Sequence, residues 1–117
     1  MVGLRVLIVE DSLLLSLELE QGLIDAGAEV VGCAAEVEDA MNMLSLTFDA
    51  AVLDANLNGE AVTPVAEALA ARGTPFVFAT GYADKAAPLG FDAPIVRKPY
   101  NVRQIAQALA EVTGRAG

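Results

Sequence analysis

The chain has 117 residues, of which 55% are hydrophobic and 20% are charged, so it suits one globular domain with a substantial core. Seven basic and 16 acidic residues give a net charge of -9, which disfavours direct binding to nucleic acid. The chain has no histidine, which excludes the usual zinc sites, Ser-His triads and imidazole bases. No apolar run is long enough to span a bilayer, and the N-terminus lacks the features of a signal peptide. We therefore expect a cytoplasmic protein with no membrane association, in which residues 1–117 form a single domain without an output domain.

The predicted elements alternate between apolar runs and stretches with helical spacing. In chain order, the pattern predicts a strand at 4–11, a helix at 12–27, a strand at 28–35, a helix at 36–47, a strand at 48–59 that ends on Asp54 and enters an Asn/Gly turn, a helix at 62–73, a strand at 74–81, a short strand within 91–100 and a helix at 101–114. The stretch 82–93 has little periodicity, and we expect a helix of two turns at most there. This order predicts an α/β fold in which a parallel sheet carries helices on both faces.

Local signals set several boundaries. Gly27 and Gly73 are expected to follow the ends of helices, and Asn101 is expected to cap the last helix. The single cysteine, Cys33, cannot form an internal disulfide. It lies in an apolar stretch, so we expect it to pack rather than to react.

Polar side chains follow four of the predicted strands at the point where each strand ends. They are Glu10 with Asp11, then Asp54, Thr80 and Lys98. Ligands of open α/β sheets bind beyond the carboxyl ends of the strands, so we expect these groups to converge in one pocket. Taken singly, each has a simpler interpretation: Asp11 as a helix cap, Asp54 as a turn cap, Thr80 as an ordinary strand residue and Lys98 as a surface charge.

The chemistry of this set is coherent. Three carboxylates in one pocket repel one another unless a cation joins them, and hard oxygen ligands suit Mg²⁺ or Mn²⁺. A carboxylate that stays partly free can act as a nucleophile and form an aspartyl phosphate. Mg²⁺ and Lys98 would then supply positive charge, and Thr80 a hydroxyl, for the phosphoryl oxygens.

Four short motifs occur together, in order: "VEDS" after the first strand, "VLDANLNG" after the third, "FATG" after the fourth and "VRKPY" after the fifth. With them the whole chain resembles the response-regulator receiver domains of two-component signalling. The resemblance implies a flavodoxin-like (βα)5 sandwich with a five-stranded parallel sheet in the order 2-1-3-4-5. It also implies Asp54 as the phosphoacceptor, Glu10 and Asp11 as the acidic pair that holds Mg²⁺, and the backbone carbonyl of Asn56 as a further ligand.

Further roles follow from the same resemblance. Thr80 would be the switch hydroxyl, Lys98 would pair with the phosphoryl group, and the bond from Lys98 to Pro99 is usually cis in this family.

Most receivers carry Tyr or Phe three positions before the lysine, where this chain has Ile95. "FATGY" is similar to the FAT GUY group of single-domain receivers, which resembles regulators paired with HWE-type histidine kinases. Tyr82 is then either the aromatic that replaces the missing switch ring or an ordinary loop aromatic.

Helical spacing gives the 12–27 helix two apolar stripes. One stripe is expected to pack on the sheet and consists of Leu15, Leu19, Leu23 and Ala26. The other consists of Leu13, Leu17 and Ile24, and neighbouring elements could cover it. Receivers commonly meet the phosphohistidine helices of a kinase through this helix, so the resemblance favours partner docking at Leu13 and Leu17.

The leading hypothesis is a signalling switch that takes a phosphoryl group from a histidine kinase or a phosphotransfer protein onto Asp54. It would be a substrate that catalyses its own phosphorylation and dephosphorylation, and it would change partner binding through Thr80 and the following loop. A second hypothesis is a Mg²⁺-dependent phosphohydrolase with an Asp nucleophile, but enzymes of the haloacid-dehalogenase type need a second Asp where this chain has Asn56. A third is a flavodoxin-like cofactor binder, which the acidic "EDSLLL" disfavours, and a fourth is a pseudo-receiver that only binds proteins.

Overall fold

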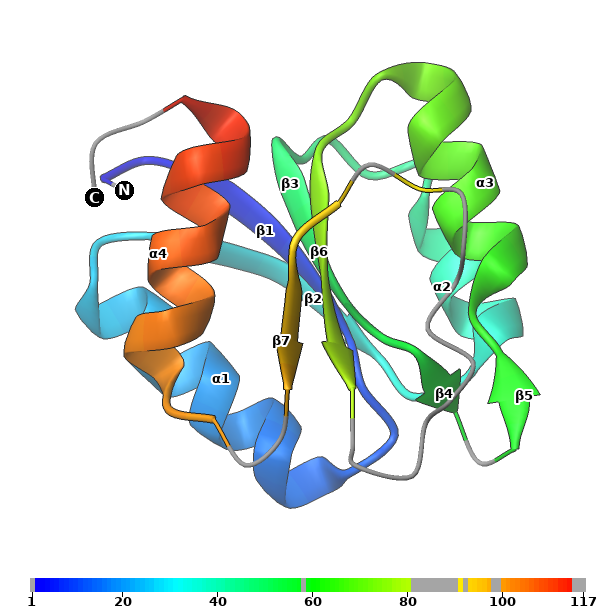
Figure 1. Ribbon diagram of the computed structural model, residues 1–117, viewed down its shortest axis with the longest axis horizontal. Helices are drawn as coiled ribbons and strands as arrows, with labels where there is room; N and C mark the ends of the chain where they lie inside the picture. Colours follow the sequence, from blue (N-terminus) through cyan, green and yellow to red (C-terminus); the bar gives the residue numbers. More distant parts are fainter. Residues whose placement is uncertain (1, 58, 81–90, 92, 98–99, 115–117) are drawn as a thin grey trace.

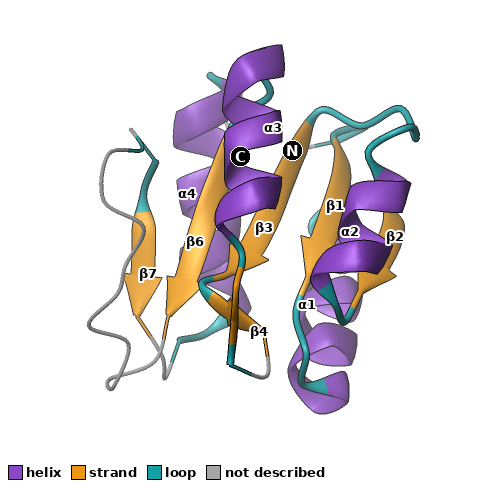
Figure 2. Ribbon diagram, turned by 90° about the vertical axis from the view of Figure 1, so that its right-hand side faces the viewer, coloured by secondary structure: helices purple, strands orange, loops and turns teal. Residues whose placement is uncertain are grey.

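Five parallel strands form the central sheet in the described part of the molecule. The computed structural model describes residues 2–57, 59–80, 91, 93–97 and 100–114. Within these residues the sheet has the order β2-β1-β3-β6-β7, with β2 and β7 at its two edges (Figure 2). Its strands are β1 (Arg5–Val9), β2 (Glu29–Ala34), β3 (Ala50–Asp54), β6 (Phe76–Thr80) and β7 (Ile95–Arg97). If only the five strands of this sheet are numbered in chain order, their order in the sheet is 2-1-3-4-5, as predicted.

The strand labels absent from this sheet, β4 and β5, belong to a small hairpin outside it. The strands β4 (Asn56–Leu57) and β5 (Glu60–Ala61) pair antiparallel directly after β3. Gly59 lies in the connection with a φ of 85°, a conformation that glycine adopts without steric cost. The strand predicted at 48–59 therefore ends at Asp54, as expected, and the Asn/Gly turn becomes a hairpin.

In the described part of the chain, four helices cover the two faces of the sheet (Figure 1). One face is covered by α1 (Leu13–Asp25) and α4 (Val102–Thr113), and the other by α2 (Val37–Met43) and α3 (Thr63–Arg72). The short helix that we expected within 82–93 lies outside the described residues, apart from Phe91 and Ala93. None of the described helices is both long and apolar enough to cross a membrane.

The sheet separates two hydrophobic cores because successive side chains of a strand point to opposite faces. In β1, Val6 and Ile8 are fully buried against α1 and α4. Leu7 and Val9 are fully buried in the core with α2 and α3. Burial on both faces explains why the strands are continuous apolar runs, and it fixes where each strand ends.

Capping residues confirm most of the predicted helix boundaries. The side chain of Asn101 accepts a hydrogen bond from the Gln104 N–H, and the Gln104 side chain accepts one from the Asn101 N–H, at 3.0 and 2.8 Å. This is the reciprocal capping box at the start of α4. Gly73 ends α3 with a φ of 72°, and Gly27 follows the Ala26 cap of α1 with a φ of 99°.

Two expectations about packing were wrong. Ala26 lies beyond the last residue of α1 and is exposed, and the buried face of the helix contains Ser16 beside Leu19 and Leu23. Cys33 is exposed because β2 is an edge strand with a neighbour on one side only. Partial burial nevertheless raises the pKa of the Cys33 thiol, which favours the less reactive protonated form.

The helices α1 and α4 approach each other closely at Gly22. A Cβ atom at this position would lie 2.8 Å from the Cβ of Val102, the first residue of α4, and closer still to one of its methyl groups. Real carbon atoms do not approach to this distance, so the absence of a side chain at Gly22 is what allows the contact. The interior glycine lowers helix propensity, and close packing of α1 on α4 offsets that cost.

We predict that Gly22→Ala destabilises the domain by about 1–3 kcal/mol, because it overpacks the contact with Val102. Helix propensity alone predicts the opposite, a gain of about 1 kcal/mol for alanine over glycine. Urea denaturation of the wild type and the variant would measure the difference in the free energy of unfolding. In a Val102→Ala background the same substitution should be neutral or stabilising, and a stabilising effect in the wild-type background would contradict this account of the contact.

Candidate functional site

The acidic residues predicted to form a site lie where β1 and β3 end. The two strands are neighbours, and Val9 of β1 is paired with Leu53 of β3. Glu10 and Asp54 are the next residues of the two strands, so the register places them side by side at the carboxyl edge of the sheet. The Glu10 N–H donates to the Ala34 carbonyl of β2 at 2.9 Å, which holds the start of this turn against the sheet.

Three carboxylates converge at this edge. Glu10, Asp11 and Asp54 each offer an oxygen atom, and these oxygens all lie within 4.8 Å of one another. Glu10 and Asp54 are each only 3% exposed, whereas Asp11 is partly exposed and opens the cluster to solvent. Because like charges in a buried site repel and lose hydration, the cluster is a strong attractor for a cation.

The start of α1 shows which residue caps this helix, and hence whether Asp11 is a helix cap. Ser12 is the N-cap, and its hydroxyl accepts a hydrogen bond from the Leu15 N–H at 3.3 Å. The Ser12 N–H donates to Glu10 Oε1 at 3.2 Å, which orients that carboxylate at the end of β1. Asp11 is therefore not the helix cap, and its carboxylate belongs to the acidic cluster.

The remaining predicted site residues come from the next two strands. Thr80 is the last residue of β6, the neighbour of β3, and it is paired with Arg97, the last residue of β7. Asn56 begins β4 two positions after Asp54, and Ile95 is an exposed residue at the start of β7. The carboxyl ends of β1, β3, β6 and β7 thus meet at one edge. Lys98, Pro99 and Tyr82 lie outside the described residues.

The leucines proposed for docking are exposed, as expected for a contact surface. Leu13 is 74% exposed and Leu17 is 53% exposed, and Leu14, which the helical spacing did not single out, is 67% exposed. Leu13 is the first residue of α1 and follows Asp11 by two positions, so this patch of leucines adjoins the acidic cluster. Beside it, a hollow of about 470 Å³ between α1 and the start of α4 is lined by Leu15, Glu18, Leu19, Gln21, Gly22, Tyr100, Asn101 and Val102.

Tyr100 is a residue that the sequence reasoning missed. Its hydroxyl is buried and has no hydrogen-bond partner among the described residues. Burial raises the pKa of Tyr100 strongly, and the charges of Glu10 and Asp54 raise it further. The hydroxyl therefore stays neutral and lies within electrostatic range of the acidic cluster. Tyr100 is the last residue of the motif "VRKPY", which was the available signal.

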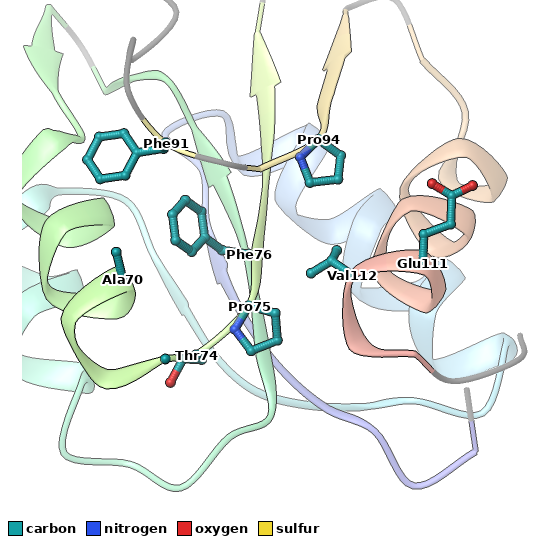
Figure 3. A pocket seen from close by; sticks show the side chains of 9 residues that line it. Ala70, Thr74, Pro75, Phe76, Phe91, Pro94, Glu111 and Val112 are labelled. Atoms are coloured by element: carbon teal, nitrogen blue, oxygen red, sulfur yellow. The ribbon is translucent and has the colours of Figure 1, made fainter.

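A second hollow lies at the opposite end of the sheet. It measures about 520 Å³ and is lined largely by apolar residues at the start of β6, before β7 and at the end of α4, including Pro75, Phe76, Phe91, Pro94 and Val112 (Figure 3). Glu111 also lines this hollow.

The donor set at the carboxyl edge fits Mg²⁺. Octahedral Mg²⁺ with bonds of about 2.1 Å holds its ligand oxygens about 3–4 Å apart. The three carboxylate oxygens, which lie within 4.8 Å of one another, can reach such an ion with small side-chain rotations. All three are hard oxygen ligands, and the partly exposed Asp11 leaves room for the waters that Mg²⁺ retains.

Comparisons with known proteins identify the family. The sequence matches no protein-family model and no curated protein. Among solved structures, SdrG from Sphingomonas melonis Fr1 is 42% identical, and the match covers 94% of this chain and 96% of that chain with a TM-score of 0.84. The BeF3-activated conformation of SdrG from Pseudomonas melonis Fr1 is 43% identical over 97% of this chain and 99% of that chain, with a TM-score of 0.78. A response regulator receiver protein from Sinorhizobium medicae WSM419 is 26% identical over 96% of this chain and 95% of that chain, with a TM-score of 0.80. The chain belongs to the response regulator receiver domains.

Proposed function

We propose that this receiver domain is a phosphorylation switch in which Asp54 accepts a phosphoryl group while Glu10 and Asp11 help to hold Mg²⁺. The observation that carries the proposal is the convergence of the three carboxylates at the end of β1 and β3. Thr80 ends the adjacent strand, so a phosphoryl group on Asp54 would lie close to its backbone. The similarity to SdrG, which has a BeF3-activated conformation, supports the same chemistry in this chain.

The transfer step follows from the nature of the donor set. A carboxylate oxygen of Asp54 attacks the phosphorus of a phosphohistidine, an O–P bond forms, and the P–N bond to the donor imidazole breaks. The imidazole leaves as a neutral ring after taking up a proton from solvent. Mg²⁺ would neutralise the carboxylates and the developing charge on the phosphoryl oxygens. Hydrolysis of the aspartyl phosphate by water would return the domain to its resting state.

The partner side of the proposal rests on α1. Leu13 and Leu17 are exposed beside the acidic cluster, so a helix that carries a phosphohistidine could pack on them while its imidazole faces Asp54. This geometry suits a histidine kinase or a histidine phosphotransfer protein. The motif "FATGY" supports placement in the FAT GUY group and hence an HWE-type kinase, with Thr80 and Tyr82 as switch residues.

Asp54→Asn is expected to abolish phosphorylation, because an amide cannot form the acyl phosphate. Labelling with a cognate kinase, or intact mass after treatment with acetyl phosphate and Mg²⁺, would detect a hydroxylamine-labile phosphoryl group in the wild type only. Asp25→Asn changes an exposed carboxylate at the far end of α1 and serves as the matched control. Persistent labelling of the Asp54 variant would show that another residue is the acceptor.

Mg²⁺ is expected to raise the melting temperature by a few degrees at millimolar concentration, because it binds the native cluster and relieves repulsion among its carboxylates. Asp11→Ala should erase most of this increase. The same variant should be as stable as the wild type, or slightly more stable, when metal is absent, since it removes one of three like charges. Coincident melts of the wild type with and without Mg²⁺ would exclude the metal site.

Leu13→Glu is expected to slow phosphotransfer from the kinase by about tenfold or more, as for an apolar contact at the centre of an interface. Labelling by acetyl phosphate should remain unchanged, because this small donor does not need the docking surface. Leu46→Glu is the control, since it adds the same charge to a leucine that is 42% exposed beyond α2. Equal loss with both donors would indicate damage to the fold and not to docking.

A further inference from the structure

The hollow at the amino edge of the sheet lies where β6 and β7 begin at different levels. Ile95, the first residue of β7, pairs with Phe78, whereas β6 begins two residues earlier at Phe76. The start of β6 therefore extends beyond the start of β7, and the space beside it is a hollow of about 520 Å³. Residues at the ends of α3 and α4 also line this space, at the edge of the sheet opposite the acidic cluster (Figure 3).

Two prolines in the walls of this hollow are held by the sheet. The Pro75 carbonyl accepts a hydrogen bond from the Ala51 N–H at 3.2 Å, and the Pro94 carbonyl accepts one from the Phe78 N–H at 2.9 Å. Both prolines also have a restricted φ, so these segments have little freedom to move into the space. The hollow is therefore preformed, which lowers the free-energy cost of binding a ligand there.

Aromatic rings form one wall of the hollow. The Phe76 and Phe91 rings meet edge to face with their centroids 6.0 Å apart, and they also contact the Phe78 ring, at 5.4 and 6.1 Å. Mutual contact among the three rings keeps the two lining rings in place. Ligand pockets typically have volumes of about 300–1,000 Å³ and combine such apolar walls with a few polar groups. The size and lining of this hollow therefore suit a small molecule with an apolar group.

The charge of the lining is negative. Glu111 is the one charged side chain among the described residues that line the hollow, and Figure 3 shows it on α4, across from the Phe76 and Phe91 rings. A carboxylate near aromatic rings favours a cation, because the carboxylate charge and the ring faces both attract it. The chain has a net charge of -9, so its charge repels phosphate-bearing ligands and disfavours a second copy of the same chain.

We propose that this hollow binds a small apolar amine, a molecule with one aromatic or branched apolar group and one ammonium group. The apolar group would lie against Phe76 and Phe91, and the ammonium group would pair with the exposed Glu111 carboxylate. This site is separate from the acidic cluster, and the inference does not rest on the proposed function.

The test is an NMR titration of the domain with phenethylammonium, with phenethyl alcohol as an uncharged probe of the same size. We expect the amine to shift the amide signals of Phe76, Phe91 and Val112 and to bind with a Kd of roughly 10 mM or below, as is usual for so small a ligand. It should bind about threefold more tightly than the alcohol, because only the amine pairs with Glu111. Glu111→Gln should make the two probes bind equally well. Ala70→Trp, which places a large side chain into the hollow from an exposed position, should abolish the binding of both.

Glu38→Gln removes an exposed carboxylate of α2 that does not line the hollow, and this matched control should keep the preference for the amine. The proposal is wrong if the amine and the alcohol bind the wild type equally well, or if neither shifts these signals at its highest soluble concentration. Amine-induced shifts confined to the carboxyl edge would overturn it too, because they would reflect attraction of any cation to the acidic cluster. If the same signals change with protein concentration alone, a second copy of the chain occupies the hollow in place of an amine. None of these outcomes bears on the phosphorylation of Asp54, so the two proposals can fail separately.

Discussion

Mutual repulsion among Glu10, Asp11 and Asp54 is the constraint on which the rest of the site depends. Unit charges at the 4.8 Å limit of the cluster repel by roughly 3 kcal/mol per pair in a medium of effective dielectric constant about 20. The two hydrophobic cores hold β1 and β3 in register against this repulsion, so the carboxylates cannot separate by moving the strands. The stability of the fold is thus used to maintain a site that prefers a bound cation, and neutralisation of that site is linked to folding.

Strand ends could be predicted from the sequence because a strand buried on both faces is a continuous apolar run. The first acidic residue after such a run marks the end of the strand. Glu10 and Asp54 were found in this way. The neighbours of each strand are not encoded in such a run, and the sheet order came from resemblance to receiver domains. Periodicity also failed where a residue's surroundings depend on distant elements. Cys33 is exposed because β2 is an edge strand, and the charges of Glu10 and Asp54 act on Tyr100 although the three residues are far apart in the sequence.

The two sides of helix α1 have different surroundings. Its inner side packs against α4 so closely that Gly22 has no room for a side chain. Its outer side leaves Leu13 and Leu17 exposed, and Leu13 follows Asp11 of the acidic cluster by two positions. The close inner contact fixes the orientation of the helix, and this in turn fixes where the exposed leucines lie relative to Asp54. A partner that packs on these leucines would therefore approach Asp54, the proposed acceptor, at a defined distance, which is what transfer between two side chains requires.

A phosphoryl group on Asp54 would add negative charge to a site that already holds three carboxylates, in a domain with a net charge of -9. Mg²⁺ would offset part of this charge, and further donors would come from the other side of the site, where β6 ends at Thr80 and β7 ends at Arg97. Any structural response should therefore begin at the ends of β6 and β7 and leave β1 and α1 in place. Separate elements would then serve the partner that delivers the phosphoryl group and the partner that senses it. The domain could then signal its state without disturbing the surface proposed for phosphotransfer.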